Sequence, residues 1–163
     1  MLIHFAKKLT IFLKKLFSIF LIFNLTCVST AQAAAVFVDS FSVNAYNEGN
    51  LPDAVAFNNN GTKMFVTGSN GRAVNEYTLT TGFDVSTATY AGDDERFVVS
   101  SEDDSPRGLA FNNDGTKMFV VGTENDAVYE YTLTTGFDVS TASYVDSFDT
   151  STTNPSGITF NRS

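Results

Sequence analysis

Short apolar stretches alternate with clusters of Asn, Asp, Gly and Ser through most of the chain after residue 51. The stretches are rich in Val, Phe, Tyr and Thr, and such runs between turn-forming residues indicate β-strands. No stretch shows a sustained helical period with capping residues. We therefore predict an all-β fold with two sets of strands, at 53–57, 62–68 and 73–79 and at 107–111, 116–122 and 127–133, each set followed by a fourth strand.

The predicted strand at 62–68 (TKMFVTG) is apolar on both of its faces. Met64 and Val66 point to one side and Phe65 to the other, because successive side chains of a strand alternate. This pattern fits a sheet that is covered on both sides. If the strand pairs with 73–79 across a four-residue turn, Lys63 and Glu76 lie diagonally on one face, within reach of an ion pair.

Two segments of the chain, 52–90 and 106–144, are near copies of one another, with 28 of 39 aligned residues identical. A third copy begins at Pro155. Strand-rich repeats of roughly 40–50 residues are typical of β-propellers. Within each repeat, Asp84 or Asp138 can cap the backbone that follows it, as in Asx turns. The aromatic residues that recur are expected in the core: Tyr77, Tyr131, Phe83 and Phe137.

The sequence NNDGTKMFV between two strands, with a later strand ending in YTL, resembles the blades of secreted bacterial β-propeller repeat proteins of the YVTN, NHL and WD40-like kind. The resemblance covers residues 36–163. It implies blades of four antiparallel strands, at 52–105 and 106–154, and the start of a third blade at 155–163. The WD dipeptide is absent because the chain has no Trp. The site residues of the lactonases in this group find no match, so that activity is not carried over.

The segment 36–42 (VFVDSFS) resembles the fourth strand of the second repeat at 144–148 (YVDSF). We therefore assign 34–51 to an N-terminal outer strand and linker, a resemblance that suggests ring closure by this strand. Propeller rings take about four to eight blades, whereas only two full blades are encoded here. We interpret the chain as an incomplete ring, a fragment or a truncated gene product; an assembly of several chains is the alternative.

The first 33 residues predict a signal peptide. Four Lys residues precede an apolar run at 16–28, and Ala31-Gln32-Ala33 is a small-x-small cleavage pattern. We predict cleavage after Ala33, with Ala35 as the second choice, and an exported protein that is secreted, periplasmic or at the cell surface. An uncleaved membrane anchor is the alternative, although the run is shorter than the ~20 residues of a membrane span.

Cleavage would remove four of the ten Lys and Arg residues and none of the 18 Asp and Glu residues, so the net charge would change from −8 to −12. A chain this acidic repels phosphates and anionic lipids, so we expect neither nucleic acid nor membrane partners. The single His and the single Cys also lie before residue 34. The remaining chain cannot build a Ser-His-Asp or Cys-His nucleophile or a Cys/His zinc site.

Two acidic clusters, at 93–95 and 102–104, flank a short strand predicted at 96–100. Calcium takes about six to eight oxygen ligands, so these carboxylates are its candidates: Asp93, Asp94, Glu102, Asp103 and Asp104. Neither cluster has a known loop spacing or recurs in the second repeat, so a solvated acidic surface is the alternative. No other cofactor is expected, and nothing points to a glycosidase-like carboxylate pair.

The two repeats differ mainly at one end of the predicted sheets. The turns 69–72 and 123–126 share no residue, and the connections 91–105 and 145–154 differ in length, whereas the TTGFDVST segments at the other end are identical. Free drift of loops and specialisation for a partner both account for this difference. If a ligand binds at this end, the charged residues expected to meet it are Arg72, Arg96, Arg107, Glu124 and Asp126.

We therefore predict an exported, non-catalytic propeller module that binds an extracellular ligand, protein or surface. One alternative is the N-terminal fragment of a propeller enzyme, hydrolase-like or lactonase-like, whose catalytic residues lie in other blades. Another is a structural repeat array of a cell surface or particle coat. Self-association through uncovered blade faces is also expected, because each blade buries its apolar faces against its neighbours.

Overall fold

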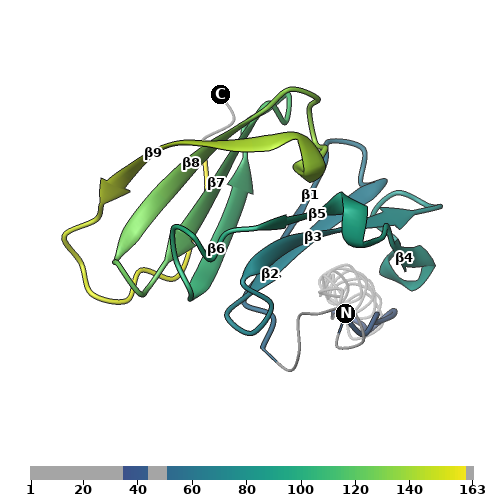
Figure 1. Cartoon of the computed structure of the whole chain (residues 1–163). Coiled ribbons are helices and arrows are strands. Elements are labelled where there is room, and N and C mark those ends of the chain that lie inside the picture. The colour runs from purple at the N-terminus through teal and green to yellow at the C-terminus, as the bar shows by residue number, and fades with distance from the viewer. Residues whose placement is uncertain (1–34, 44–50, 161–163) are drawn as a thin grey trace, which may run out of the picture. The chain divides into compact units, whose positions relative to one another are not determined.

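The computed structural model describes residues 35–43 and 51–160, so the predicted signal peptide lies outside the described residues. The chain divides into two units, Met1–Phe37 and Val38–Ser163, and every strand described belongs to the second. This second unit is all-β, as predicted, with two antiparallel sheets (Figure 1). Nowhere in the described part of the chain does a helix reach the length and apolar character needed to span a membrane.

The first sheet is formed by the first repeat. Its strands are β1 (Ala54–Phe57), β2 (Lys63–Gly68), β3 (Ala73–Leu79), β4 (Ala88–Tyr90) and β5 (Arg96–Val98). The order is β1-β2-β3-β4, and β5 also pairs with β3. Two 3₁₀ turns, η1 (Val85–Thr87) and η2 (Asp93–Glu95), precede β4 and β5.

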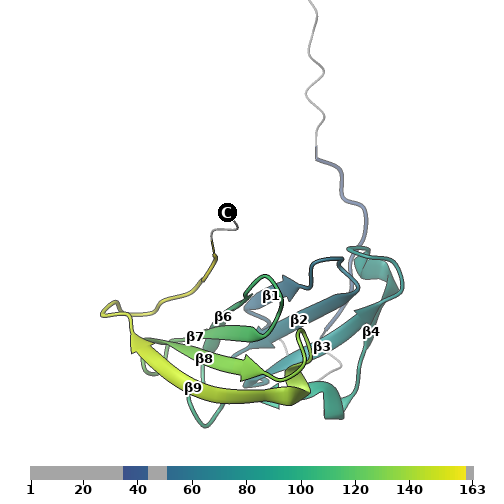
Figure 2. The ribbon, with the colours of Figure 1, turned by 90° about the horizontal axis from the view of Figure 1, so that it is seen from above.

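The second sheet is formed by the second repeat, with the order β6-β7-β8-β9. Its strands are β6 (Pro106–Phe111), β7 (Lys117–Gly122), β8 (Ala127–Leu133) and β9 (Ala142–Asp149), and η3 (Val139–Thr141) precedes β9. Figure 2 shows the two sheets side by side, with β6 against β1 and β2. Each sheet is therefore a four-position antiparallel blade, as the repeat pattern predicts.

The register between the second and third strands is the predicted one. Phe65 faces Glu76 and Gly68 faces Ala73, and the second repeat repeats this pairing. The predicted ion pair between Lys63 and Glu76 is confirmed, with Nζ 2.6 Å from Oε1. Its counterpart, between Lys117 and Glu130, measures 2.7 Å.

The outer strand of the first sheet differs from the prediction. β5 confirms the short strand predicted at 96–100, but it lies inside the segment 91–105, which we expected to be a connection between blades, and it pairs with the first half of β3. β4 pairs with the second half of β3, so β4 and β5 form one outer strand interrupted by η2. Likewise β9 contains the fourth strand predicted at 144–148 and runs to Asp149, so it occupies half of the segment 145–154 that we also expected to be a connection. The connections are shorter than expected because the outer strands pair along the full length of β3 and β8.

The prediction that Asp84 and Asp138 both cap the following turn holds for one of them. The Asp84 carboxylate accepts the backbone N–H of Ser86 at 3.1 Å. Asp138 makes no side-chain hydrogen bond to the backbone at the start of η3 and accepts only the Ser140 hydroxyl, at 2.6 Å. The identical TTGFDVST segments thus use the same aspartate differently, because only the second faces another sheet.

The main core lies between the two sheets. Phe65 and Val74 from the first sheet join the face of the second sheet that carries Met118, Val120 and Tyr131. A smaller cluster covers the opposite face of the first sheet, where Phe41 and Val43 pack against buried residues that include Tyr77. Among residues 35–43, where we expected an outer strand, the structure assigns no strand. Both faces of β2 are therefore packed, as its apolar pattern predicts, although Val55 of β1 on the outer face of the sheet stays 56% exposed.

Candidate functional site

The end of the sheets where the repeats differ is built by two tight turns. The last residue of each, Arg72 and Asp126, has a positive φ, of 51° and 53°. The Arg72 N–H donates to the carbonyl of Gly68 at 3.0 Å, which closes the first turn. Few residues other than Gly, Asn and Asp adopt this conformation readily, so it suits Asp126 better than Arg72. The backbone is thus conserved between repeats although the side chains differ.

The three arginines predicted to meet a ligand all contact their own chain at this end. Arg107 pairs with Asp53 at 2.7 Å, and Arg72 pairs with Asp104 at 3.2 Å. The Arg96 guanidinium donates to the carbonyl of Gly71 at 2.7 Å. Asp53 and Arg107 occupy the same position in successive repeats, so this ion pair joins the first blade to the second.

A pocket of about 310 Å³ lies beside the Asp53–Arg107 pair, and we call it the polar pocket. Its other lining residues carry hydroxyl and amide groups: Thr123, Asn154 and Ser156. Asp126 borders this region, because its carboxylate accepts the Asn154 N–H at 2.7 Å. The polar pocket therefore brings together the turn of the second repeat and the segment that follows β9. Glu124, the remaining predicted ligand residue, is exposed in the same turn as Thr123 and Asp126.

Asp103, one of the predicted calcium ligands, is a buried structural anchor with 2% of its surface exposed. Its carboxylate accepts three backbone N–H groups, from Ser105 at 2.8 Å, Asn125 at 3.0 Å and Glu124 at 3.3 Å. It also accepts the Tyr129 hydroxyl at 3.3 Å. The carboxylate fastens the connection after β5 to the turn between β7 and β8, so it holds one wall of the predicted binding end.

The other predicted calcium residues are dispersed. Glu102 accepts the Tyr131 hydroxyl at 3.3 Å, and burial raises the pKa of Tyr131 far above its usual value, with the nearby Glu102 charge adding to this. Asp93 accepts the Tyr90 hydroxyl at 2.9 Å, Asp104 pairs with Arg72, and Asp94 is exposed. Calcium binding at these residues stays a prediction.

A carboxylate cluster that sequence reasoning missed lies where the two sheets meet at the opposite end. Among the residues that the structure describes, the single group of three metal-type side chains is Glu76, Glu95 and Asp138, whose oxygens lie within 4.8 Å of one another. Burial raises the pKa of Glu76 above its usual value of 4.5, opposed by Lys63 and reinforced by Glu95 and Asp138. The cluster has the donor set of a cation site, but the Lys63 ammonium already supplies a positive charge there.

The repeat pattern of the sequence indicated some members of this cluster but not Glu95. Lys63 and Glu76 recur in the second repeat, and Asp138 recurs as Asp84, but Glu95 belongs to the insertion that interrupts the outer strand. Its approach to Glu76 depends on how η2 folds back over β3, which the spacing of residues does not reveal.

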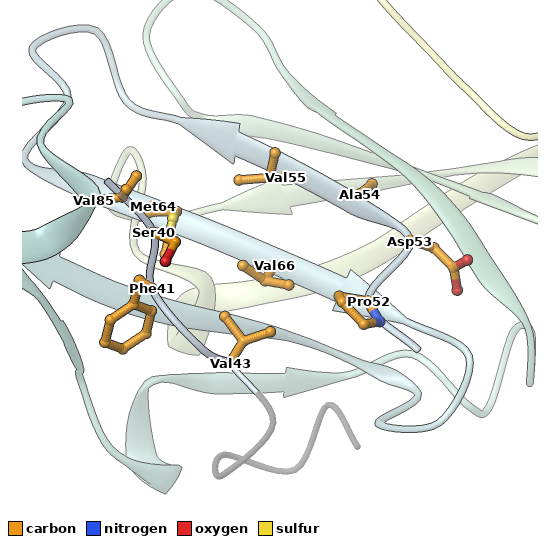
Figure 3. Close-up of a pocket in the computed structure, with 10 residues that line it drawn as sticks. All are labelled: Ser40, Phe41, Val43, Pro52, Asp53, Ala54, Val55, Met64, Val66 and Val85. Carbon is orange, nitrogen blue, oxygen red and sulfur yellow. The ribbon is translucent and has the colours of Figure 1, made fainter. Parts of the chain in front are cut away.

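A second pocket, of about 400 Å³, lies on the outer face of the first sheet, and we call it the apolar pocket. Figure 3 shows Met64 and Val66 on β2, Val55 on β1 and Val85 lining it, with Phe41 and Val43 on the segment that crosses the sheet. Its walls are mostly hydrocarbon, with Ser40 and Asp53 as the polar exceptions, so it offers mainly apolar contact area.

Comparison with models of known protein families gave no match, and comparison with curated proteins gave none either.

Proposed function

We propose that the chain is an exported, non-catalytic binding module built from propeller-type blades, and that its ligand binds in the polar pocket. The supporting observation is the position of this pocket. It lies at the end of the sheets where the repeats differ, and it is lined by Asp53 and Arg107, one from each repeat. Residues at which the two repeats differ thus line the polar pocket.

The lining suggests the chemistry of the ligand. Arg107 offers a forked donor that suits a carboxylate, and Thr123, Asn154 and Ser156 offer groups that suit hydroxyls. Asp53 holds the guanidinium in place at 2.7 Å and can also accept a ligand hydroxyl. The volume is near the lower limit of about 300–1,000 Å³ for small-molecule sites. A sugar acid, which combines one carboxylate with several hydroxyls, matches this set.

The test is a titration of the isotopically labelled full chain with a uronic acid and with the neutral parent sugar, followed by backbone amide NMR. We expect the uronic acid to shift the amides of Thr123 and Asn154 and the neutral sugar to bind more weakly. Arg107→Gln should weaken binding by at least about tenfold, the usual worth of a hydrogen bond to a charged group.

The matched control is Lys117→Gln, which removes a half-exposed ion-paired cation from the opposite end of the same sheet. It should leave the affinity unchanged. Shifts confined to the TTGFDVST end, or an Arg107→Gln chain that binds as well as the parent, would contradict the proposal.

A further inference from the structure

The interface between the two sheets is organised around the side chain of Phe65 on β2. Its ring has 0% exposure and lies 4.6 Å from the ring of Phe111 and 6.4 Å from that of Phe137. The aliphatic residues that the second repeat contributes to the same core cluster include Leu109, Met118, Val120 and Val139, together with Leu133 and Ala127. The β2–β3 hairpin therefore inserts a Phe side chain into an apolar site formed by these residues of the second repeat, which we call the Phe seat.

The apolar pocket repeats this seat one blade earlier. The residues 54 positions before Leu109, Met118, Val120 and Val139 are Val55, Met64, Val66 and Val85, and all four line the apolar pocket. The counterparts of Leu133 and Ala127 are not among its lining residues. What differs is the covering: Val55 is 56% exposed, whereas its counterpart Leu109 is 6% exposed. The pocket thus has the composition of a Phe seat, with an aliphatic wall still open to solvent.

The segment 38–43 reproduces another part of the same interface. Its VDSF matches VDSF at 145–148, where Phe148 faces Val128 as Phe97 faces Val74 in the first sheet. Phe97 lies edge-on to Tyr131 at 5.2 Å and 74°, and Phe41 lies edge-on to Tyr77, the counterpart of Tyr131, at 5.6 Å and 76°. The segment therefore takes the place of the outer strand of a preceding blade.

We propose that the apolar pocket is a docking site for a β-hairpin of the repeat's own kind, whose aromatic residue at the Phe65 position fills it. The occupant we infer is the β7–β8 hairpin, residues 116–133, of a second copy of this chain, because Phe65 of the 62–79 hairpin is already buried between the two sheets. The internal interface supplies the template, since the equivalent hairpin of the first repeat already occupies the equivalent seat between the two sheets. This inference does not depend on the proposed function of the polar pocket.

A polar contact adds specificity to the apolar one. In the internal interface Lys63 Nζ donates to the carbonyl of Phe137 at 2.8 Å while it pairs with Glu76. The docked hairpin would bring the equivalent lysine to the carbonyl of Phe83, in the identical TTGFDVST segment of the first repeat. A hairpin that lacks either the aromatic residue or the lysine should fit the pocket less well.

The probe is a synthetic peptide of residues 116–133, labelled with a fluorophore and cyclised through its ends, because an isolated hairpin is marginally stable in water. Cyclisation suits the register, in which Lys117 faces Thr132. Binding to the full chain is followed by fluorescence anisotropy. We expect saturable binding that the Phe119→Ala peptide weakens by at least about thirtyfold, as for a central aromatic contact of an interface.

The complementary variant is Val55→Glu in the full chain, at a position exposed enough for the fold to survive, which circular dichroism verifies. It should weaken binding of the parent peptide, whereas Ser100→Glu, which adds the same charge to an exposed residue outside both sheet faces, should not. No binding at millimolar concentration, equal binding of the Phe119→Ala peptide, or binding unaffected by Val55→Glu would each overturn the proposal.

Discussion

Two buried carboxylates, Asp103 and Glu76, interact with parts of the chain that are distant in sequence. Asp103 accepts four hydrogen bonds while 2% exposed, and Glu76 shares its site with two further carboxylates and one lysine. Burial of a charge is tolerated only where partners compensate for lost hydration. Substitution of either residue should therefore change the free energy of unfolding more than substitution of an exposed carboxylate of the same chain does.

Asp103→Asn should destabilise the fold by ~3 kcal/mol, because hydrogen bonds to a charged group contribute about 1.5–3 kcal/mol and the new amide NH₂ would face backbone donors. Chemical denaturation measures this change. The control is the adjacent Asp104→Asn, which breaks only an exposed ion pair with Arg72 and should cost less than about 1 kcal/mol. Equal losses in the two variants would mean that Asp103 is not the anchor described.

Glu76 should make stability depend on pH. Burial raises the pKa of this carboxyl in the folded chain, and Glu95 and Asp138 act in the same direction against Lys63. The folded state then binds the proton more tightly than the unfolded state does. The resulting stabilisation is complete below the ordinary pKa of 4.5 and is lost as pH rises through the raised value.

The measurement compares the unfolding free energy of the parent and the Glu76→Gln variant between pH 4 and 8. The difference should move in favour of the Gln variant as pH rises, because Gln cannot ionise. Glu130→Gln, at the same repeat position with a side chain 30% exposed, is the matched control. A pH dependence of the same size in both variants would contradict the role assigned to burial.

At the scale of the elements, the strands themselves could be predicted, including the short strand at 96–100 that does not repeat, but the pairing of that strand could not. β2, β3, β7 and β8 lie where the alternation of apolar residues places them, because their register follows from a short turn and two apolar faces. The segment 91–105 was expected to be a connection between blades although it contains the predicted strand at 96–100, because an insertion with three acidic residues interrupts the outer strand. Polar residues normally indicate a loop, and pairing of β5 with β3 is a non-local contact that no local pattern reports.

The same comparison makes a prediction about the insertion. Tyr90 and Val98 pair with residues at equivalent positions of β3 to those with which Tyr144 and Asp149 pair on β8. The first outer strand is therefore three residues longer than the second over the same stretch. Deleting Asp93–Glu95 should therefore give the first sheet a continuous outer strand like β9. We expect the variant to stay folded, with NMR cross-strand contacts to β3 uninterrupted. Loss of cooperative unfolding would show that η2 is needed for the sheet.

The candidate site was predictable to a similar degree. The differences between the repeats predicted that Arg107 and Asp126 lie at the same end of the sheets. The reason is that every second turn of an antiparallel meander lies at the same end. The differences did not reveal that Arg107 pairs with Asp53 or that Asp103 turns inward, because both depend on how one blade is set against the next. The apolar pocket was equally hidden, since its residues read as ordinary strand residues until their exposure is compared between repeats.

Within the second unit, the two sheets share one core and should unfold as one. Phe83 and Phe137 occupy the same position in identical TTGFDVST segments, and both have a positive φ, of 62° and 58°. Phe137 packs against Phe65 across the sheet interface, with 6.4 Å between ring centroids, and against Phe111 of its own sheet, with 5.5 Å. The prediction that Phe83 lies in the core is wrong, because this residue is 60% exposed and packs on Phe57 of its own sheet. The chain thus provides its own matched pair for measuring the interface.

Phe137→Ala should cost ~3 kcal/mol, toward the lower end of values for buried aromatic residues, and Phe83→Ala about 1 kcal/mol or less. The decisive readout is hydrogen exchange rather than the size of the loss. If the shared core couples the sheets, Phe137→Ala should accelerate exchange in β2 and β3 as much as in β7 and β8, because removal of one partner exposes the other face. Exchange accelerated in the second sheet alone would show that the blades unfold independently, and the neighbour-to-neighbour coupling expected of a repeat array would then be weak in this chain.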